Sequence, residues 1–281
     1  MVFAITCIFA IFAVGCSNNS NQDGNRDGVV QNGAQQNGQE LIGSIQIAGS
    51  TSVQPLSEEL AMEFMKLHPK VKINVAGGGS GAGIRSAQDG TADIGASSRT
   101  LKDEEKTVKE FTIAKDGLAI VVNRENKVEG LTMDQAMQVF TGKITNWREL
   151  GGSDAPITVV IREDGSGTRG AFQEIVLGKE ESFTEDALIQ NSTGALRTVV
   201  SGNPDAIGFI SLGALNEDVK ALKIDGVEAS KENVINDTYT LARPFLYLTE
   251  SEPQGLVKSF IDFVLSQEGQ KIVEVKFVPV K

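Results

Sequence analysis

The segment SIQIAGSTSVQPL, residues 44 to 56, decides the fold because two periodicities meet in it. Its first part, SIQIAGS, alternates between apolar and polar side chains as a half-buried strand does. Apolar residues then recur at helical spacing, at Leu56, Leu60, Phe64 and Leu67. Pro55 fits this pattern only in the first turn of a helix. The segment therefore predicts a strand, a Gly-Ser-Thr-Ser turn and a helix.

The same pattern repeats further along the chain. A second strand is predicted over 72–79 (KINVAGGG), a short helix over 80–90 after a glycine-rich turn, and a third strand over 92–98 (ADIGASS). A further apolar strand follows over 117–123 (GLAIVVN). Strands that alternate with helices predict an α/β fold with a mainly parallel sheet.

After residue 123 the chain is expected to enter a second α/β region. Its predicted elements are a helix over Met133 to Phe140, a turn with Trp147, a strand over 157–161, helices after Thr168 and near Gly194 to Val200, and a strand over 206–211. A late strand over 239–249 and a C-terminal helix through Leu256, Phe260 and Val264 follow.

The domain organisation follows from this order, because a strand and a helix left over at the end often return to the first domain. We predict a discontinuous first domain, residues 43–121 and 243–281, and a second domain, residues 122–242. Two crossings, near Val121 to Arg124 and near Tyr239 to Arg243, would then act as a hinge.

Residues 1–15 are predicted to be a signal peptide. Val2 to Gly15 is almost wholly apolar, but a helix of that length spans roughly 21 Å against roughly 30 Å of membrane hydrocarbon. The run ends in Ala13-Val14-Gly15-Cys16, which resembles a lipobox, so we expect Cys16 to be lipidated after cleavage. The alternative for Cys16 is a buried structural cysteine.

Residues 16–42 are expected to form the lipidated cysteine and a flexible tether. The stretch from Ser17 to Gln39 is rich in Asn, Gln, Gly and Ser and has too little apolar surface to offset its ordering entropy. With Cys7 in the signal peptide and Cys16 lipidated, the mature chain has no thiol pair for a disulfide or a cysteine metal site.

Composition limits the functional classes. The chain has 281 residues, 40% hydrophobic content and a formal net charge of -11. This content is ample for a buried core, in one large or two modest domains. The acidic balance and the lack of a Lys/Arg run argue against a nucleic-acid surface. An anionic ligand would therefore depend on local groups.

Three glycine-rich turns offer such groups. GSTS (49–52), GGGSGAG (77–83) and DGSGTRG (164–170) each follow a predicted strand and open a predicted helix. Helix N-termini carry unpaired N–H donors and partial positive charge, and glycine lets the backbone approach a ligand closely. Three converging turns would make an anion cradle without a metal, although a single turn of this kind is usually only a turn.

Arg162 and Asp164 add charged groups to the third turn. The Arg162 guanidinium is a planar fork suited to two oxyanion oxygens; the alternative is a surface ion pair with Glu163 or Asp164. A carboxylate only accepts hydrogen bonds, so Asp164 would favour an anion that still carries a proton, as phosphate does and sulfate does not. The alternative for Asp164 is a turn or helix-cap residue.

The motifs GSTSV, GGGSGAGI, ADIGASSR, ITNWREL and IREDGSGTRGAF occur in this order within residues 43–281. They resemble the motifs of the PstS family, the phosphate-binding components of phosphate ABC transporters. The resemblance implies a two-domain, type II periplasmic-binding-protein fold that closes on one phosphate. The phosphate-binding residues that it implies are Thr51, Ser52, Ser80, Ser98, Arg162, Asp164, Ser166, Gly167 and Thr168.

One position departs from the family pattern. Better-known members carry an aspartate where this chain has Ser98, and its replacement removes one proton acceptor. The contributions of Ser50 and Ser97 stay open at this point.

The resulting hypothesis is a lipoprotein on the extracytoplasmic face of the cell membrane. It would bind inorganic phosphate as a monomer without a cofactor and deliver it to the permease and ATPase subunits of an ABC transporter. The alternatives are the same fold selective for sulfate or molybdate, a phosphatase-type enzyme, and a surface adhesin. An enzyme would need a metal or a nucleophile–base pair, but His68 is the only histidine and no His or Cys cluster exists. We therefore expect no catalysis and no metal.

Overall fold

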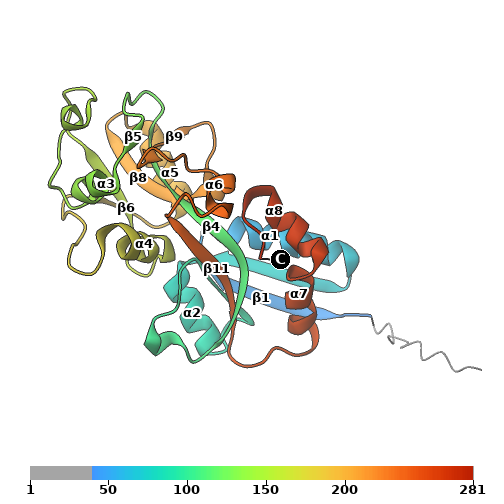
Figure 1. Cartoon of the computed structure of the whole chain (residues 1–281). Helices are drawn as coiled ribbons and strands as arrows, with labels where there is room; N and C mark the ends of the chain where they lie inside the picture. The colour runs from blue at the N-terminus through green and yellow to red at the C-terminus, as the bar shows by residue number, and fades with distance from the viewer. Residues whose placement is uncertain (1–39, 281) are drawn as a thin grey trace, which may run out of the picture. The chain divides into compact units, whose positions relative to one another are not determined.

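The computed structural model describes residues 40–280. The predicted signal peptide, the lipidation site Cys16 and the tether up to residue 39 lie outside the described residues. Within residues 40–280 the chain builds two lobes joined by two long neighbouring strands (Figure 1).

The first lobe combines the start and the end of the described chain. Its strand β1 (Gly43–Gly49) pairs in parallel with β2 (Val71–Gly77) and with β3 (Ile94–Ser97). Its helices are α1 (Gln54–Leu67), α2 (Ser80–Gln88), α7 (Gly255–Val264) and α8 (Gln267–Lys276). The predicted strand–turn–helix repeat is therefore present.

The second lobe repeats the arrangement. Its strand β6 (Thr158–Arg162) pairs in parallel with β8 (Ala206–Ser211) and with the short β7 (Leu188–Gln190). Its helices are α3 (Met133–Phe140), α4 (Gly167–Phe172), α5 (Thr193–Gly202) and α6 (Lys231–Ile235). Short strands complete it: β5 (Gly130–Leu131), β9 (Val219–Ala221) and β10 (Lys223–Ile224).

Single turns of other helix types connect these elements. They are the 3-10 turns Asp103–Glu105, Trp147–Leu150 and Leu212–Ala214 and the π-helical segment Gln173–Leu177. The predicted turn at Trp147 and the helix over Met133–Phe140 match the structure. Asn146 and Thr132 cap these two elements by accepting bonds from Arg148 N–H and Gln135 N–H.

Two strands connect the lobes. β4 (Lys109–Asn123) and β11 (Ala242–Thr249) are antiparallel neighbours, and β4 continues into the second lobe to pair with β8 and β9. The sheet order is β2-β1-β3-β11-β4-β8-β6-β7, so it is parallel within each lobe and antiparallel at the centre. The predicted strand over 117–123 is thus only the second half of β4.

Each lobe has its own hydrophobic core. Phe64 and Phe260 pack edge to face in the first, and Phe172 and Phe209 stack at 4.0 Å in the second. Ala114 of β4 belongs to the core of the first lobe, and Leu118 belongs to the core of the second lobe. Where the chain returns to the first lobe, Leu241 still belongs to the second core and Phe245 to the first. The change of core along β4 comes earlier than the predicted crossing near residue 121, and the domain boundaries themselves stay a prediction.

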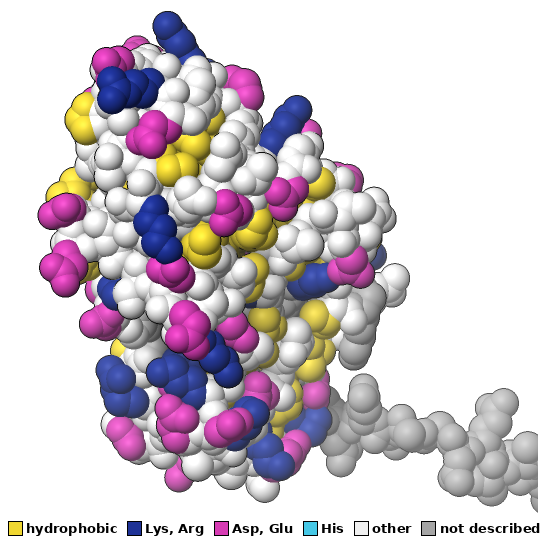
Figure 2. All heavy atoms as spheres, turned by 60° about the vertical axis from the view of Figure 1, so that its left-hand side comes forward, with side chains coloured by type: hydrophobic (Ala, Val, Ile, Leu, Met, Phe, Trp, Pro, Cys, Tyr) yellow, Lys and Arg dark blue, Asp and Glu magenta, His cyan; other side chains and the backbone are white. Residues whose placement is uncertain are grey.

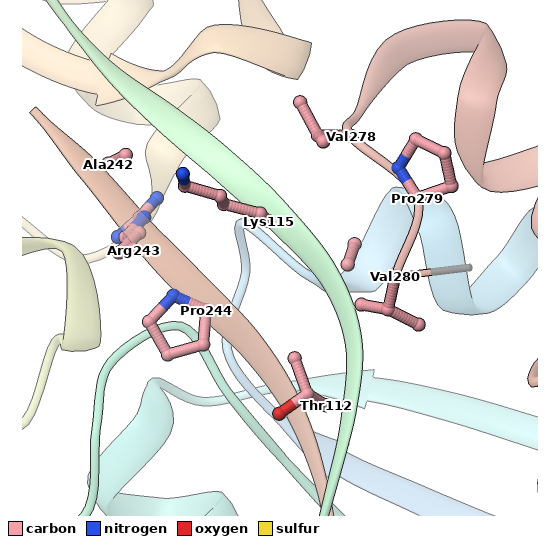
Figure 3. A pocket seen from close by; sticks show the side chains of 9 residues that line it. Thr112, Lys115, Ala242, Arg243, Pro244, Val278, Pro279 and Val280 are labelled. Atoms are coloured by element: carbon pink, nitrogen blue, oxygen red, sulfur yellow. The ribbon is translucent and has the colours of Figure 1, made fainter. Parts of the chain in front are cut away.

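The C-terminal segment runs along the two connecting strands. Val278 forms an antiparallel bridge with Lys115 of β4, with N···O distances of 2.9 and 3.0 Å. A pocket of about 430 Å³ lies between Val278–Val280 and the strand residues Thr112 and Pro244 (Figure 3). The end of the chain therefore packs against both β4 and β11.

Close packing of α2 on the sheet depends on Gly83. A Cβ at this position would lie 2.7 Å from the carbonyl oxygens of both Ala48 and Ala96. These oxygens belong to β1 and β3, so only glycine lets the helix lie this close to the strands. The approach also brings the N-terminus of α2 to the ends of these strands.

We predict that Gly83→Ala lowers the free energy of unfolding by about 1–3 kcal/mol, because the added methyl group overpacks this contact. Gly202→Ala is the matched control: Gly202 also lies in a helix, but an added Cβ would meet open space. The control should be neutral or stabilising by about 0.4–1 kcal/mol. Urea unfolding of the two variants measures both values, and equal effects would contradict the packing argument.

Candidate functional site

The N-terminal ends of helices from both lobes meet between the lobes. We call the side chains that bond to one another there the hydroxyl cluster: Ser50, Thr51, Ser52, Ser80, Ser98, Thr168 and Thr193. All except Thr51 are buried. Within the cluster, Ser52 Oγ lies 2.8 Å from Thr168 Oγ1 of the other lobe.

Ser98 occupies the first-lobe side of the cluster. Its hydroxyl accepts a bond from Ser50 at 2.9 Å and lies 3.3 Å from the Ser80 hydroxyl. The Ser80 hydroxyl in turn accepts the Ser98 backbone N–H at 3.0 Å. Ser50, which the sequence left open, is thus part of the cluster, whereas the Ser97 hydroxyl donates to the Arg99 carbonyl.

Glycine residues of the two lobes also lie in contact beside the cluster. The Gly81 N–H donates to the Gly165 carbonyl oxygen at 2.8 Å, a direct bond between the lobes. A Cβ at Gly167 would lie only 2.1 Å from the Ser80 hydroxyl and 2.7 Å from that of Ser98. Gly167 therefore lets the start of α4 approach the two serines.

Arg162 ends β6 beside the cluster. Its side chain is only 2% exposed. Nε and Nη2 donate to the Glu163 carboxylate at 2.8 Å each, and Nη1 donates to the Thr193 hydroxyl at 3.1 Å. Arg162 therefore pairs with Glu163, as the alternative expected, but the guanidinium is buried and not at the surface, and its Nη1 group faces the hydroxyl cluster.

Thr193 is the residue that the sequence analysis missed. It is the first residue of α5, and its hydroxyl lies 2.8 Å from that of Ser52 and 3.3 Å from that of Thr51. It also accepts the Arg162 bond. The signal for it was the Ser-Thr-Gly sequence at the start of a predicted helix, which no glycine-rich turn precedes.

Asp164 does not lie in the cluster. Its carboxylate is 95% exposed and pairs with Arg169 at 3.0 Å. This placement matches the alternative interpretation of Asp164 as a residue of the turn. It does not support the prediction that Asp164 accepts the proton of a bound anion. Ser166 is the N-cap of α4 and accepts the Arg169 N–H at 3.2 Å, so its hydroxyl already serves the helix.

The cluster borders a pocket of about 370 Å³. Thr51, Ser52 and Thr193 line one part of it, and Arg197 and Lys276 line another. On the face that Figure 2 shows, basic side chains are interspersed with acidic ones. With a negative net charge, any attraction for an anion would have to come from local groups.

The described residues also set limits on other kinds of site. Among residues 40–280, no group of His, Cys, Asp and Glu is arranged to hold a metal ion. No helix in this range is both long and apolar enough to cross a bilayer. In the same range every buried side-chain nitrogen and oxygen has at least one hydrogen-bond partner, and this includes the buried hydroxyls of the cluster.

Comparisons with known proteins give the family. The family described as "PBP superfamily domain" matches residues 34–268. The phosphate-binding protein PstS of Bacillus subtilis is 35% identical over 245 residues, which cover 85% of this chain and 81% of that protein. The chain belongs to the PstS family.

Solved structures of PstS-like proteins agree with the fold. A candidate phosphate ABC transporter substrate-binding protein from Clostridium perfringens, solved with bound phosphate, is 48% identical with a TM-score of 0.82 over 85% of this chain and 100% of that one. An ABC-type phosphate transport receptor from Vibrio cholerae is 39% identical with a TM-score of 0.70 over 84% of this chain and 100% of that one. The predicted two-domain, type II periplasmic-binding-protein fold and the resemblance to PstS are both confirmed.

We predict that Thr193→Val lowers the free energy of unfolding by about 1–3 kcal/mol, because it leaves a buried Arg162 donor without its partner. The control is Thr198→Val in the same helix, whose exposed hydroxyl bonds only to the Gly194 carbonyl. Its effect should stay within about 0.5 kcal/mol. Thermal and urea unfolding compare the two, and a neutral Thr193→Val would show that Arg162 does not depend on this hydroxyl.

Proposed function

We propose that this chain binds inorganic phosphate in the hydroxyl cluster between its two lobes and delivers it to the permease of an ABC transporter for import. The observation that carries the proposal is the convergence of buried hydroxyls, helix N-termini and one arginine donor from both lobes. The names of two similar proteins, phosphate-binding protein and phosphate transport receptor, support it.

The chemistry of the cluster suits a tetrahedral oxyanion. Each hydroxyl can donate to one anion oxygen, and the N-termini of α1, α2, α4 and α5 add backbone N–H groups and partial positive charge. The Nη1 group of Arg162 contributes a charge-assisted bond. We therefore place the ligand among Ser52, Ser80, Ser98, Thr168 and Thr193, next to Arg162.

Thr51 and Gly167 complete this set. Gly167 contributes backbone at the start of α4, and Thr51 holds Thr193 by accepting its N–H at 3.2 Å. Asp164 and Ser166 were predicted as ligands from the sequence, but we assign them to the support of α4. The proposed site needs no metal and no cofactor.

Ligand binding would be coupled to closure of the lobes. The proposed ligand groups are divided between the lobes, and β4 and β11 are the connections. A single ion can bond to both groups only when the lobes are together, so binding would favour the closed arrangement by mass action.

The alternatives are another tetrahedral oxyanion, such as sulfate or molybdate, or a phosphatase-type enzyme. The test is a panel of phosphate, sulfate, molybdate and a phosphomonoester in a thermal-shift assay, with a colorimetric check for released phosphate. At about a hundred times its Kd a ligand stabilises the protein by about 2.7 kcal/mol. We expect a shift with phosphate alone and no release of phosphate from the ester.

Arg162→Met should weaken phosphate binding by about tenfold to a hundredfold, because the structure directs one charge-assisted donor at the cluster and such a bond is worth about 1.5–3 kcal/mol. The control is Arg148→Ala in the same lobe, where an exposed arginine pairs with Asp154. Calorimetry at constant pH measures both. An unchanged affinity for Arg162→Met would remove Arg162 from the site.

The same titrations decide the role of Asp164. If Asp164 only supports the turn, Asp164→Asn leaves the preference for phosphate over sulfate unchanged, because the carboxylate lies in solvent. A gain of sulfate affinity in this variant would restore the hypothesis that Asp164 accepts the proton of phosphate and excludes sulfate.

We further propose that the protein is anchored outside the cytoplasm through a lipid on Cys16, at the end of a flexible tether. The apolar run before Cys16 and the polar sequence after it support this proposal. Cys16→Ala should release the mature protein from the membrane fraction, whereas Cys7→Ala should leave it there. Equal membrane association of the wild type and Cys16→Ala would reject the lipid anchor.

A further inference from the structure

The two strands that connect the lobes carry a buried ion pair that the proposed phosphate site does not include. Asp116 of β4 and Arg243 of β11 stand directly opposite each other in the strand register. Nε and Nη2 of Arg243 donate to Asp116 Oδ2 at 3.1 and 3.0 Å. The two side chains are 1% and 0% exposed, Arg243 first. The pair lies where β4 passes from one hydrophobic core to the other.

Each member of the pair holds a different lobe. Asp116 Oδ1 accepts the hydroxyl of Ser211, the last residue of β8 in the second lobe, at 2.9 Å. Arg243 Nη1 donates to the backbone carbonyl of Ser98 at 3.1 Å. Ser98 is a central member of the hydroxyl cluster, with Ser50 and Ser80 as partners. A continuous chain of bonds therefore runs from β8 through the two strands to the cluster.

Stability alone does not account for this pair. Burying two charges costs several kcal/mol in desolvation, and well-packed apolar residues at such positions are often neutral or stabilising. Figure 3 shows Arg243 on β11 between Ala242 and Pro244, beside β4. What an apolar pair could not supply is the donor to the Ser98 carbonyl.

Charge also connects the pair to the site. Burial lowers the pKa of Arg243, Asp116 opposes this shift, and the nearby positive charge of Arg162 adds to it. The two arginines are thus near enough to repel each other, and each is paired with a carboxylate, Asp116 or Glu163. Loss of one member would leave an uncompensated charge beside the proposed anion.

We propose that Arg243 is a positioning residue of the anion site: it fixes the Ser98 segment through the Ser98 carbonyl, and Asp116 holds Arg243 in place from the strand that joins the lobes. The inference rests on the proposed function of the cluster. It predicts that phosphate affinity depends on a residue that does not touch the ligand.

The experiment is calorimetric titration with inorganic phosphate, together with thermal unfolding, of the wild type, Arg243→Met, the apolar double variant Asp116→Leu/Arg243→Met, and Lys109→Ala. Lys109 is the control because it lies on the same strand in an exposed pair with Glu252. We expect Arg243→Met to lose stability and at least about tenfold in affinity, the double variant to recover stability but not affinity, and the control to match the wild type.

A double-mutant cycle with Ser98→Ala separates positioning from general damage. If Arg243 acts through Ser98, Arg243→Met costs a smaller factor in the Ser98→Ala background than in the wild type. Arg243→Lys, which keeps the charge but not the planar fork, should fall between the wild type and Arg243→Met and serves if the methionine variant does not fold.

An apolar double variant that binds phosphate as tightly as the wild type would overturn the inference and leave the pair a structural element. Independent, multiplicative effects of Arg243→Met and Ser98→Ala would overturn it as well. A wild type that binds no phosphate overturns the proposed function first, and this result is visible before any variant is compared.

Discussion

A buried charge has to be paired, and this constraint organises the space between the two lobes. Arg162 and Arg243 are both buried and both lie near the hydroxyl cluster. Each has its own carboxylate, Glu163 or Asp116, so the two pairs together add no net charge. An anion placed in the cluster would therefore be held mainly by hydroxyl and backbone dipoles, with the Nη1 group of Arg162, which donates to Thr193, as the one charged exception. The negative net charge of the chain leads to the same conclusion: it repels an anion at long range, so attraction must come from groups in short-range contact with the anion.

Dipoles act only at close range, so the groups of the cluster must lie close together. Two features of the fold bring them together: glycine residues that allow close packing, and the two strands that connect the lobes. Gly83 lets α2 lie on β1 and β3, and Gly167 lets the start of α4 reach Ser80 and Ser98. The Gly81–Gly165 backbone bond then joins the two lobes directly. β4 and β11 connect the lobes through an antiparallel ladder that runs from Lys109 to Gly117 with one bulge near Phe245. Close packing at the glycines and the strand ladder thus both hold the hydroxyl groups of the two lobes near one another.

The sequence predicted what depends on local pattern. Periodicity located the helix Met133–Phe140 and the strands that precede the glycine-rich turns, and the turn chemistry located most of the hydroxyl cluster. It could not locate the beginning of β4, because residues 109–116 mix charged and apolar side chains. Nor could it decide which of two adjacent carboxylates turns inward: Glu163 bonds to Arg162, and Asp164 faces solvent. Thr193 and the Asp116–Arg243 pair depend on contacts between distant parts of the chain, which no local pattern encodes.

The serine at position 98 fits the pairing constraint better than an aspartate would. A carboxylate there would bury a further negative charge, while the two buried arginines, Arg162 and Arg243, are already paired with Glu163 and Asp116. Such a group would need another cation or would shift to its neutral form. A hydroxyl avoids this cost because it can donate to one partner and accept from another, as Ser98 does with Ser50. A cluster of hydroxyls can serve both the bare and the protonated oxygens of phosphate, so in this chain the acceptor for the proton need not be a carboxylate.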